Sequence, residues 1–345
     1  MEKCDILSLS FDELLQKIKD MGEAQFRAKQ IFSWLHSSCV TSFDEMTNIS
    51  KNLRQKLDDN FVIFGAAIEK KLISEYDDTN KYLFRLHDGE FVESVLMKYK
   101  YGYSICVSTQ VGCRMGCKFC ASTLGGVVRS LNASEILSQI YSAQRDNNIK
   151  ISHVVLMGMG EPLDNFDNVM RFLELVTDEN GQNMSMRHIS LSTCGVVPKI
   201  YELMDRNLQL TLSVSLHAPN DEIRSAMMPV NKKWNITELL TACKKYTDTT
   251  HRRISFEYAM VSGKNDSDEC AAELAKRLRG ILCHINLIPV NEVKETGCVR
   301  SSKERIEAFI RILEKKGYTV TVRRTLGSDI NASCGQLRRS ANKKN

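Results

Sequence analysis

The sequence predicts an α/β protein built on a partial (βα)6 barrel, with an N-terminal helical accessory domain and a small antiparallel β layer. Three observations predict this architecture. Apolar residues recur with helical period over residues 1–60 and with strand period over residues 61–105. Short β-rich runs then alternate with helical runs over residues 106–330. Each pattern is typical of one kind of element, so the order of the patterns gives the order of the domains.

The first two regions differ in their period. The segments FDELLQKIKDMG, EAQFRAKQIFSWLHSS and ISKNLRQKLDDNF place apolar residues at i, i+3, i+4 and i+7, so we expect residues 1–60 to be helical. Over residues 61–105 the apolar residues alternate with polar ones, and turn signals stand at EYDDTN, HDGE and KYGY. We expect this second region to form a linking layer of short antiparallel strands.

The region over residues 106–330 predicts the barrel. Strand-like runs that each precede a helical run lie at 151–160, 187–195, 210–219, 253–261 and 284–291, with a last strand at 318–325. Repeated βα units imply a parallel sheet with right-handed crossovers. No G-x-G-x-x-G motif follows the first strand, so a barrel fits better than an open nucleotide-binding sheet. Residues 331–345 are expected to form a loop around Cys334 and a basic tail.

Composition narrows the class of protein. Hydrophobic residues make up 43% and charged residues 26% of the chain, which is ordinary for a globular protein. No apolar run approaches the roughly 20 residues that cross a bilayer, and the N-terminus lacks a signal-peptide core. We therefore expect a cytoplasmic protein without a membrane span. The net charge of +5 permits binding to nucleic acid without requiring it.

The stretch VGCRMGCKFCAS holds Cys113, Cys117 and Cys120 with C-x3-C-x2-C spacing. In a reducing compartment such a cluster indicates metal chemistry rather than disulfides. Zinc needs a fourth ligand, and the loop has no further Cys or His. A [4Fe–4S] cluster held by three thiolates keeps one iron open for chemistry. The spacing, with aromatic Phe119 before the third cysteine, resembles the radical S-adenosylmethionine (SAM) superfamily.

Polar residues follow the predicted strands and should converge at the C-terminal face of the barrel, where barrel enzymes place their chemistry. Singly, each has an ordinary interpretation as a turn residue, a helix cap or a surface histidine. The superfamily resemblance implies that Glu161 receives the amino group of SAM and that the small glycines allow close approach. The resemblance also implies that the other contacts to SAM come from residues at the strand ends. The full set of expected SAM-binding residues is Gly160, Glu161, Ser192, Ser215, Leu216, His217 and Asn291.

A closer resemblance extends from about residue 10 to residue 340. The motifs GCRMGCKFCASTLGG, MGMGEPL, STCGVVPKI, SLHAPND with MMPVN, INLIPVN and CGQLR look like those of the radical SAM RNA methyltransferases. Members methylate adenosine at C2 (the RlmN type) or at C8 (the Cfr type). The resemblance implies two SAM molecules per turnover, one as methyl donor and one as radical source.

The family mechanism implies roles for two further cysteines and a glutamate. Cys334 matches the cysteine that accepts a methyl group from SAM, and cations such as Arg323 and Arg324 nearby would stabilise its thiolate. Cys106 matches the cysteine that resolves the RNA–protein adduct through a transient disulfide. Glu93 matches a glutamate assigned as a proton acceptor, and its alternative interpretation is an exposed strand carboxylate.

The residues after the third cysteine, ASTLGG, and the segment LIPVN favour the C2 type over the C8 type. Asn331 and Ser333 stand where many relatives have Asp and Ala, which barely affects the assignment. The resemblance implies 23S ribosomal RNA and tRNA as substrates and an electron donor such as flavodoxin, and we expect a monomer. Arg27 and Lys29 lie beside aromatic residues in a segment like the family's RNA-gripping domain, although a plain amphipathic helix explains them equally well.

Two interpretations from other classes remain open at this point. The protein could be a non-catalytic zinc or iron module that binds RNA, which predicts a redox-inert site and no SAM cleavage. It could also be a radical SAM enzyme for a small molecule, which would not need paired cysteines at positions 106 and 334.

Overall fold

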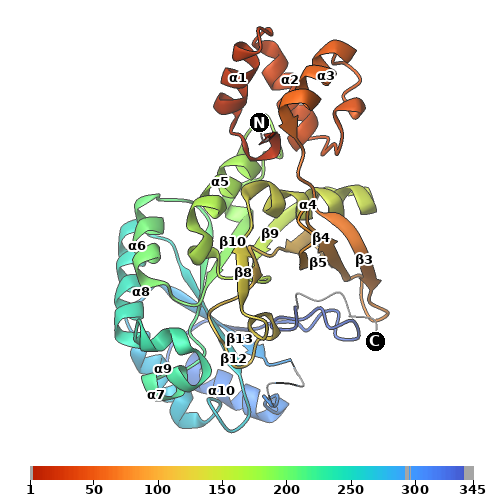
Figure 1. Ribbon diagram of the computed structural model, residues 1–345. Coiled ribbons are helices and arrows are strands. Elements are labelled where there is room, and N and C mark those ends of the chain that lie inside the picture. The colour runs from red at the N-terminus through yellow and green to blue at the C-terminus, as the bar shows by residue number, and fades with distance from the viewer. Residues whose placement is uncertain (1–2, 292–294, 296, 338–345) are drawn as a thin grey trace.

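The N-terminal domain stands at one end of the molecule in the computed structural model, which describes residues 3–291, 295 and 297–337 (Figure 1). It packs helices α1 (Phe11–Asp20), α2 (Phe26–His36) and α3 (Lys51–Asn60), with short 3-10 turns η1 (Ile6–Ser8) and η2 (Phe43–Glu45). Strand β1 (Cys4–Asp5) pairs in parallel with β2 (Phe61–Val62) and brings the two ends of this domain together. Ser10 and Glu13 form a capping box that fixes the start of α1.

His36 joins this domain to the barrel. Its Nδ1 lies 2.9 Å from the hydroxyl of Tyr141, and its carbonyl accepts a 2.6 Å hydrogen bond from Gln182 Nε2. The ring is fully buried and packs against Phe32 in a tilted arrangement, with 4.2 Å between centroids. Burial lowers the pKa of His36 to about 3, so the ring is neutral in the folded protein at pH 7.

This buried ring should make the protein sensitive to acid. The unfolded chain binds a proton at His36 below pH 6.5 and the folded chain does not, so stability falls as the pH drops from 6.5 toward 3. At pH 5 the loss from one such histidine is about 2 kcal/mol. We expect His36→Gln to shrink the difference in unfolding free energy between pH 7 and pH 5 by about that amount in urea titrations. The exposed His251→Gln is the matched control, and equal behaviour of the two variants would contradict the expectation.

The main sheet has ten strands in the order β14-β13-β12-β11-β10-β9-β6-β5-β4-β3. From β6 to β14 all neighbours are parallel, whereas β3 to β6 pair antiparallel. The strands are β3 (Ala67–Ile73), β4 (Asn80–Arg85), β5 (Phe91–Tyr99), β6 (Gly102–Cys106), β9 (Ile151–Leu156), β10 (Ile189–Thr193), β11 (Thr211–Ser215), β12 (Ile254–Met260), β13 (Cys283–Pro289) and β14 (Val320–Val322).

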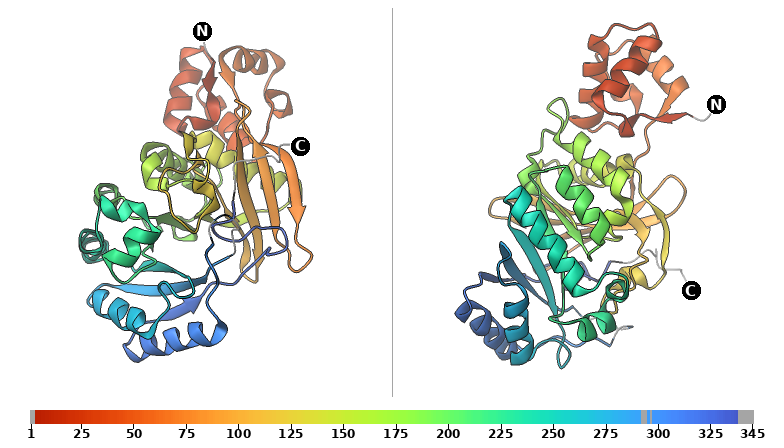
Figure 2. Two further views of the ribbon diagram at one scale, coloured as in Figure 1. Left: turned by 60° about the horizontal axis from the view of Figure 1, so that its bottom comes forward. Right: turned by 90° about the vertical axis from the view of Figure 1, so that its left-hand side faces the viewer.

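The helices cover the outer face of this curved sheet (Figure 2). They are α4 (Ala133–Asn147), α5 (Phe166–Thr177), α6 (Val197–Asp205), α7 (Asp221–Met227), α8 (Ile236–Thr250), α9 (Asp268–Arg277) and α10 (Lys303–Lys315). Helix α4 packs against α5, α6 against α8, and α9 against α10. Apolar strand residues such as Leu191, Val214 and Ile285 are buried between sheet and helices.

The barrel is open because the first parallel strand, β6, uses its second edge to pair with β5. Strand β14 therefore has no first strand to close against, and a seam remains between the two ends of the parallel sheet. The predicted α/β class, the partial barrel of βα units and the antiparallel strands are confirmed, and those strands continue the barrel sheet itself. Helix α4 and the hairpin of β7 (Gln110–Gly112) with β8 (Val127–Ser130) were not predicted.

Among the described residues, we find no helix whose length and apolar content would let it span a bilayer.

Candidate active site

The three clustered cysteines lie in the loop that the β7–β8 hairpin closes. Gly112 has φ of 78°, and a Cβ there would stand 1.9 Å from the carbonyl oxygen of Gly126. Only glycine fits such a close approach. The amide of Cys113 donates a 2.9 Å hydrogen bond to the same carbonyl. The hairpin thus fixes the start of the cysteine loop on the end of strand β6.

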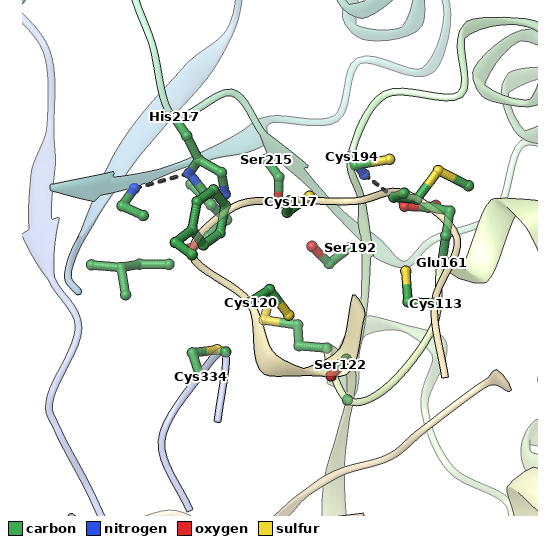
Figure 3. A pocket seen from close by; sticks show the side chains of 18 of the residues that line it. Cys113, Cys117, Cys120, Ser122, Glu161, Ser192, Cys194, Ser215, His217 and Cys334 are labelled. Atoms are coloured by element: carbon green, nitrogen blue, oxygen red, sulfur yellow. Dashed lines mark hydrogen bonds between the residues drawn. The ribbon is translucent and has the colours of Figure 1, made fainter. Parts of the chain in front are cut away.

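These cysteines fit an iron–sulfur cluster better than a single metal ion. All three line one pocket (Figure 3). Across the part of the chain that the structure describes, no three Cys, His, Asp or Glu side chains converge closely enough to hold one ion. A cluster binds each thiolate to a different iron, so its ligands stand farther apart. In the absence of the positive charge of bound iron, burial raises the pKa of Cys113 to about 12 and that of Cys117 well above its ordinary value.

The pocket has a volume of about 150 Å³ and is partly open to solvent. One wall is the cysteine loop, including Phe119 and Ser122, and a second comes from the C-terminal ends of the parallel strands. Cys334 and Gly335 enter from the last loop of the described chain, and Figure 3 shows Cys334 across the pocket from Glu161. The strand-end residues in the lining are Gly160, Glu161, Ser192, Thr193, Cys194, Ser215, His217 and Asn291.

Glu161 is buried at the bottom of this pocket. Its carboxylate accepts hydrogen bonds from the backbone amides of Leu163 at 3.0 Å and Cys194 at 2.7 Å. Burial raises the pKa of Glu161, and these hydrogen bonds oppose the shift. Gly160, with φ of 102°, has no room for a Cβ, because Gln110 N would lie 2.7 Å from it. Contact with the β7 strand therefore already requires this glycine, apart from any ligand.

His217 is a neutral donor in the pocket wall. Its Nδ1 accepts a 2.9 Å hydrogen bond from the amide of Ala259, so the ring proton sits on Nε2. Burial, with the charge of Arg224 adding to it, lowers the pKa of His217 to about 3. The ring packs edge-on against Phe119 at 4.9 Å between centroids. The imidazole thus connects the strand-end wall of the pocket to the cysteine loop.

The other predicted SAM contacts separate into two groups. Ser192 and Ser215 line the pocket, as does Asn291, whose side-chain amide donates a 3.2 Å hydrogen bond to the carbonyl of Cys334. Leu216 is buried and lies outside the lining residues. Its amide donates to Glu257 O at 3.1 Å, so its part in the site is to fix the backbone beside His217.

Cys334 also lines a second, smaller pocket together with Cys106. The second pocket follows the open seam of the barrel, between Val95, Met97 and Tyr99 of β5 and the residues after β14. Burial raises the pKa of Cys106 to about 12, and the charge of Cys334 adds to that shift. No two cysteines of the described residues form a disulfide.

Arg323 lies between the two pockets and lines both. The charge of Cys334 is the largest influence that raises the pKa of Arg323, and Glu257 and Cys106 act in the same direction. The guanidinium therefore lies where it stabilises negative charge on either sulfur. Arg324, the other cation expected near Cys334, lines only the second pocket.

Glu93 is buried and lines neither pocket. Its carboxylate forms an ion pair with Lys81 at 2.9 Å, and Lys81 donates a 3.1 Å hydrogen bond to the carbonyl of Asn331. The interpretation of Glu93 as an exposed strand carboxylate is therefore wrong. Glu93 shares a face of β5 with Val95, which pairs with Cys106, so it lies along the strand from the second pocket.

Arg224 is a site residue that sequence reasoning missed. It is fully buried behind the pocket and donates to the carbonyls of Cys194 at 2.6 Å, Ser215 at 3.2 Å and Leu216 at 3.1 Å. A further hydrogen bond of 2.9 Å reaches the side chain of Asn231. One guanidinium thereby holds the ends of β10 and β11 together, and its charge opposes the rise in the pKa of Cys117.

Comparison with known proteins places this geometry in a family. Residues 4–63 match the ribosomal RNA large subunit methyltransferase N-terminal domain, and residues 107–278 match the radical SAM superfamily. A probable dual-specificity RNA methyltransferase RlmN from Clostridium novyi (strain NT) is 56% identical over 97% of this chain and 98% of its own length. The chain belongs to the RlmN family. Another relative with the same printed name, from Lachnospira eligens, is 53% identical over 97% of this chain and 95% of its own.

A solved structure agrees with this assignment. The crystal structure of a radical SAM methyltransferase from Sphaerobacter thermophilus superimposes with a TM-score of 0.94 at 41% identity, covering 97% of this chain and 99% of that one. The predicted family, enzyme class and fold are thus confirmed. RlmN membership implies a [4Fe–4S] cluster and SAM as cofactors and RNA as substrate. Neither a non-catalytic metal module nor an enzyme for small molecules is supported.

Proposed function

We propose that this protein methylates C2 of an adenosine in RNA, with Cys334 as the methyl carrier and Cys106 as the resolving cysteine. One observation carries the proposal: Cys334 lines both the pocket of the cluster cysteines and the second pocket with Cys106. A carrier must meet the methyl donor on one side and the RNA base on the other. A cysteine at the boundary of two pockets meets that requirement.

Cys113, Cys117 and Cys120 would hold the [4Fe–4S] cluster, and the strand ends would hold SAM beside it. The bound cluster supplies the electron that cleaves SAM. Glu161 offers carboxylate lone pairs to the amino group of SAM, since each oxygen accepts only one backbone hydrogen bond from the residues named above. Ser192, Ser215, Asn291 and the Nε2–H of His217 can bind its carboxylate and hydroxyl groups. Use of two SAM molecules per turnover is part of the proposal.

The chain performs two steps with its own sulfur atoms. The Cys334 thiolate attacks the methyl group of SAM, which forms an S-methyl bond and releases S-adenosylhomocysteine. After the methyl carbon has joined the base and the ring proton has been removed, the Cys106 thiolate attacks the sulfur of Cys334. The S–S bond forms as the bond between that sulfur and the carbon breaks, and the carbon keeps the electron pair and takes up a proton, which frees the methylated RNA and leaves a transient disulfide. Arg323 lies where it stabilises thiolate charge during both steps. Glu93 is proposed as the final acceptor of the ring proton, reached along β5.

The proposed substrates are 23S ribosomal RNA and tRNA, in keeping with the dual-specificity name of the relatives. Arg27 lies 4.7 Å from the ring of Phe26, which is 59% exposed, so the N-terminal domain presents a cation and an aromatic face together. The predicted basic tail over residues 338–345 lies outside the described residues. We further propose that the enzyme acts as a monomer in the cytoplasm with an electron donor such as flavodoxin.

The position of the new methyl group tests the proposal. Anaerobically reconstituted protein should convert adenosine in a 23S ribosomal RNA fragment and in tRNA to 2-methyladenosine, identified by chromatography and mass spectrometry of the nucleosides. The C8 alternative predicts 8-methyladenosine, which separates from the C2 product. Formation of only the C8 product would overturn the C2 assignment, and loss of SAM without any methylated nucleoside would overturn the RNA methyltransferase function.

A further inference from the structure

Four aromatic rings form a continuous ladder at the edge of the second pocket. Tyr99 stacks on Tyr101 with 5.0 Å between centroids and only 5° between the ring planes. Tyr101 meets His153 edge-on at 4.8 Å, and His153 stacks on His188 at 4.3 Å. The rings come from β5, the β5–β6 turn, β9 and the turn before β10. The ladder therefore spans several elements of the barrel.

The ladder begins where the chemistry is proposed to occur. Tyr99 lines the second pocket with Cys106 and Cys334. It lies on the same face of β5 as Val95 and Met97, which line that pocket too. From Tyr99 the ladder therefore runs away from the two cysteines, along the N-terminal ends of β6, β9 and β10.

The far part of the ladder faces solvent. Tyr101 is 63% exposed and His188 is also exposed, so these rings contribute little to the core. An exposed stack of this kind is unusual as packing, because a soluble protein gains little by ordering large rings at its surface. Ring faces at a surface are, however, the feature with which proteins bind unpaired bases.

Exposed cations flank the ladder. Lys100 neighbours Tyr101, Arg187 neighbours His188, and the charge of Arg324 acts on Tyr99. Lys98, on the same strand as Tyr99, is already paired with Asp78 at 3.1 Å. Aromatic faces interleaved with cations are the combination that single-stranded nucleic acid requires, since bases stack and phosphates need positive charge.

We propose that the Tyr99–Tyr101–His153–His188 ladder is a binding site for the unpaired nucleotides that flank the target adenosine. This inference rests on the proposed function, because it places the target base in the second pocket. Stacking of flanking bases on Tyr101 would hold the strand unwound, with Lys100 and Arg187 on its phosphates. The ligand class is single-stranded RNA, since bases in a duplex do not present free faces.

Binding of a short single-stranded RNA with a central adenosine tests the ladder directly. Tyr101→Ala should weaken its binding by about five- to 150-fold, the range that corresponds to loss of one stacked base. Tyr101→Phe keeps the ring face and should bind like the parent protein. The matched control is Tyr76→Ala, since Tyr76 is a tyrosine of 77% exposure in another turn.

Salt dependence and kinetics separate stacking from a general loss of charge or fold. Lys100→Gln should reduce the slope of log affinity against log salt by about 0.7, the value for one phosphate contact on a single strand. Tyr101→Ala should leave that slope unchanged. It should raise KM for RNA at constant kcat, and it should leave the RNA-independent methylation of Cys334 by SAM unaltered.

The outcomes distinguish this inference from the function on which it rests. If Tyr101→Ala binds the RNA as tightly as the parent, or no more weakly than Tyr76→Ala, the ladder is not a binding site. A duplex RNA of the same sequence should bind more weakly than the single strand. If the duplex binds the parent protein as tightly as the single strand does, and loses the same affinity in Tyr101→Ala, the proposal that unpaired bases stack on the ladder is wrong. If the parent protein binds RNA through the ladder and methylates none, the proposed function fails and the binding site stands.

Discussion

Cys334→Ser should abolish RNA methylation and leave the fold intact. A serine hydroxyl is not ionised near neutral pH, so it cannot displace the methyl group of SAM as a thiolate does. The substitution changes one atom in a half-buried side chain. The loop carbonyls keep the hydrogen bonds that the Asn291 side-chain amide and the Ala121 backbone amide donate to them. Peptide mass spectrometry of protein loaded with iron and SAM should find one methyl group on Cys334 in the parent and none on the corresponding peptide of the variant.

Two further variants sharpen this result. Cys4→Ser is the control, because Cys4 is a half-buried cysteine in β1, far along the chain from both pockets, and it should methylate RNA normally. Cys106→Ala should still acquire the methyl group on Cys334, but RNA should remain covalently attached, since the sulfur that forms the transient disulfide is missing. If the Cys334→Ser variant methylates RNA at the rate of the parent protein, Cys334 is not the methyl carrier.

The parts of the site that sequence could predict are those that depend on short stretches of chain. The C-x3-C-x2-C spacing lies within one loop, and the strand-end residues follow from where each β-rich run stops. Because parallel strands end at one face, Glu161, Ser192 and Ser215 were expected to meet, and they do. The family motifs added Cys106 and Cys334, which the structure brings into one pocket.

The parts that sequence missed depend on pairing between distant segments. Glu93 meets Lys81 only because β4 and β5 are neighbours, and Lys81 reaches Asn331 across 250 positions of sequence. No local pattern carries such contacts. Gly160 shows a different way in which a motif can mislead. The motif suggested that glycine leaves room for a ligand, but the close packing of Gln110 against Gly160 already requires glycine at this position.

Arg224 shows most clearly why burial must be seen in a structure. In the sequence it is one basic residue within DEIRSAMM, on a helix whose N-terminus is capped by Asn220. In the fold its guanidinium is fully buried, and burial lowers its pKa. The cost of removing the charge from water is offset by its hydrogen bonds and by the charges of nearby acidic groups such as Asp221. Those bonds hold the carbonyls of Cys194, Ser215 and Leu216, at the strand ends that form one wall of the pocket.

We therefore expect Arg224→Met to lower the free energy of unfolding by about 3–5 kcal/mol, because three buried carbonyls lose their donor at once. Arg224→Lys keeps the charge but not the planar fork that reaches both strand ends, so it should restore only part of that loss. Urea titration followed by circular dichroism measures both. The exposed Arg206→Met is the control and should change stability by no more than about 0.5 kcal/mol. If Arg224→Met is as stable as Arg206→Met, the guanidinium does not hold β10 and β11 together, and the pocket floor must depend on the strand hydrogen bonds alone.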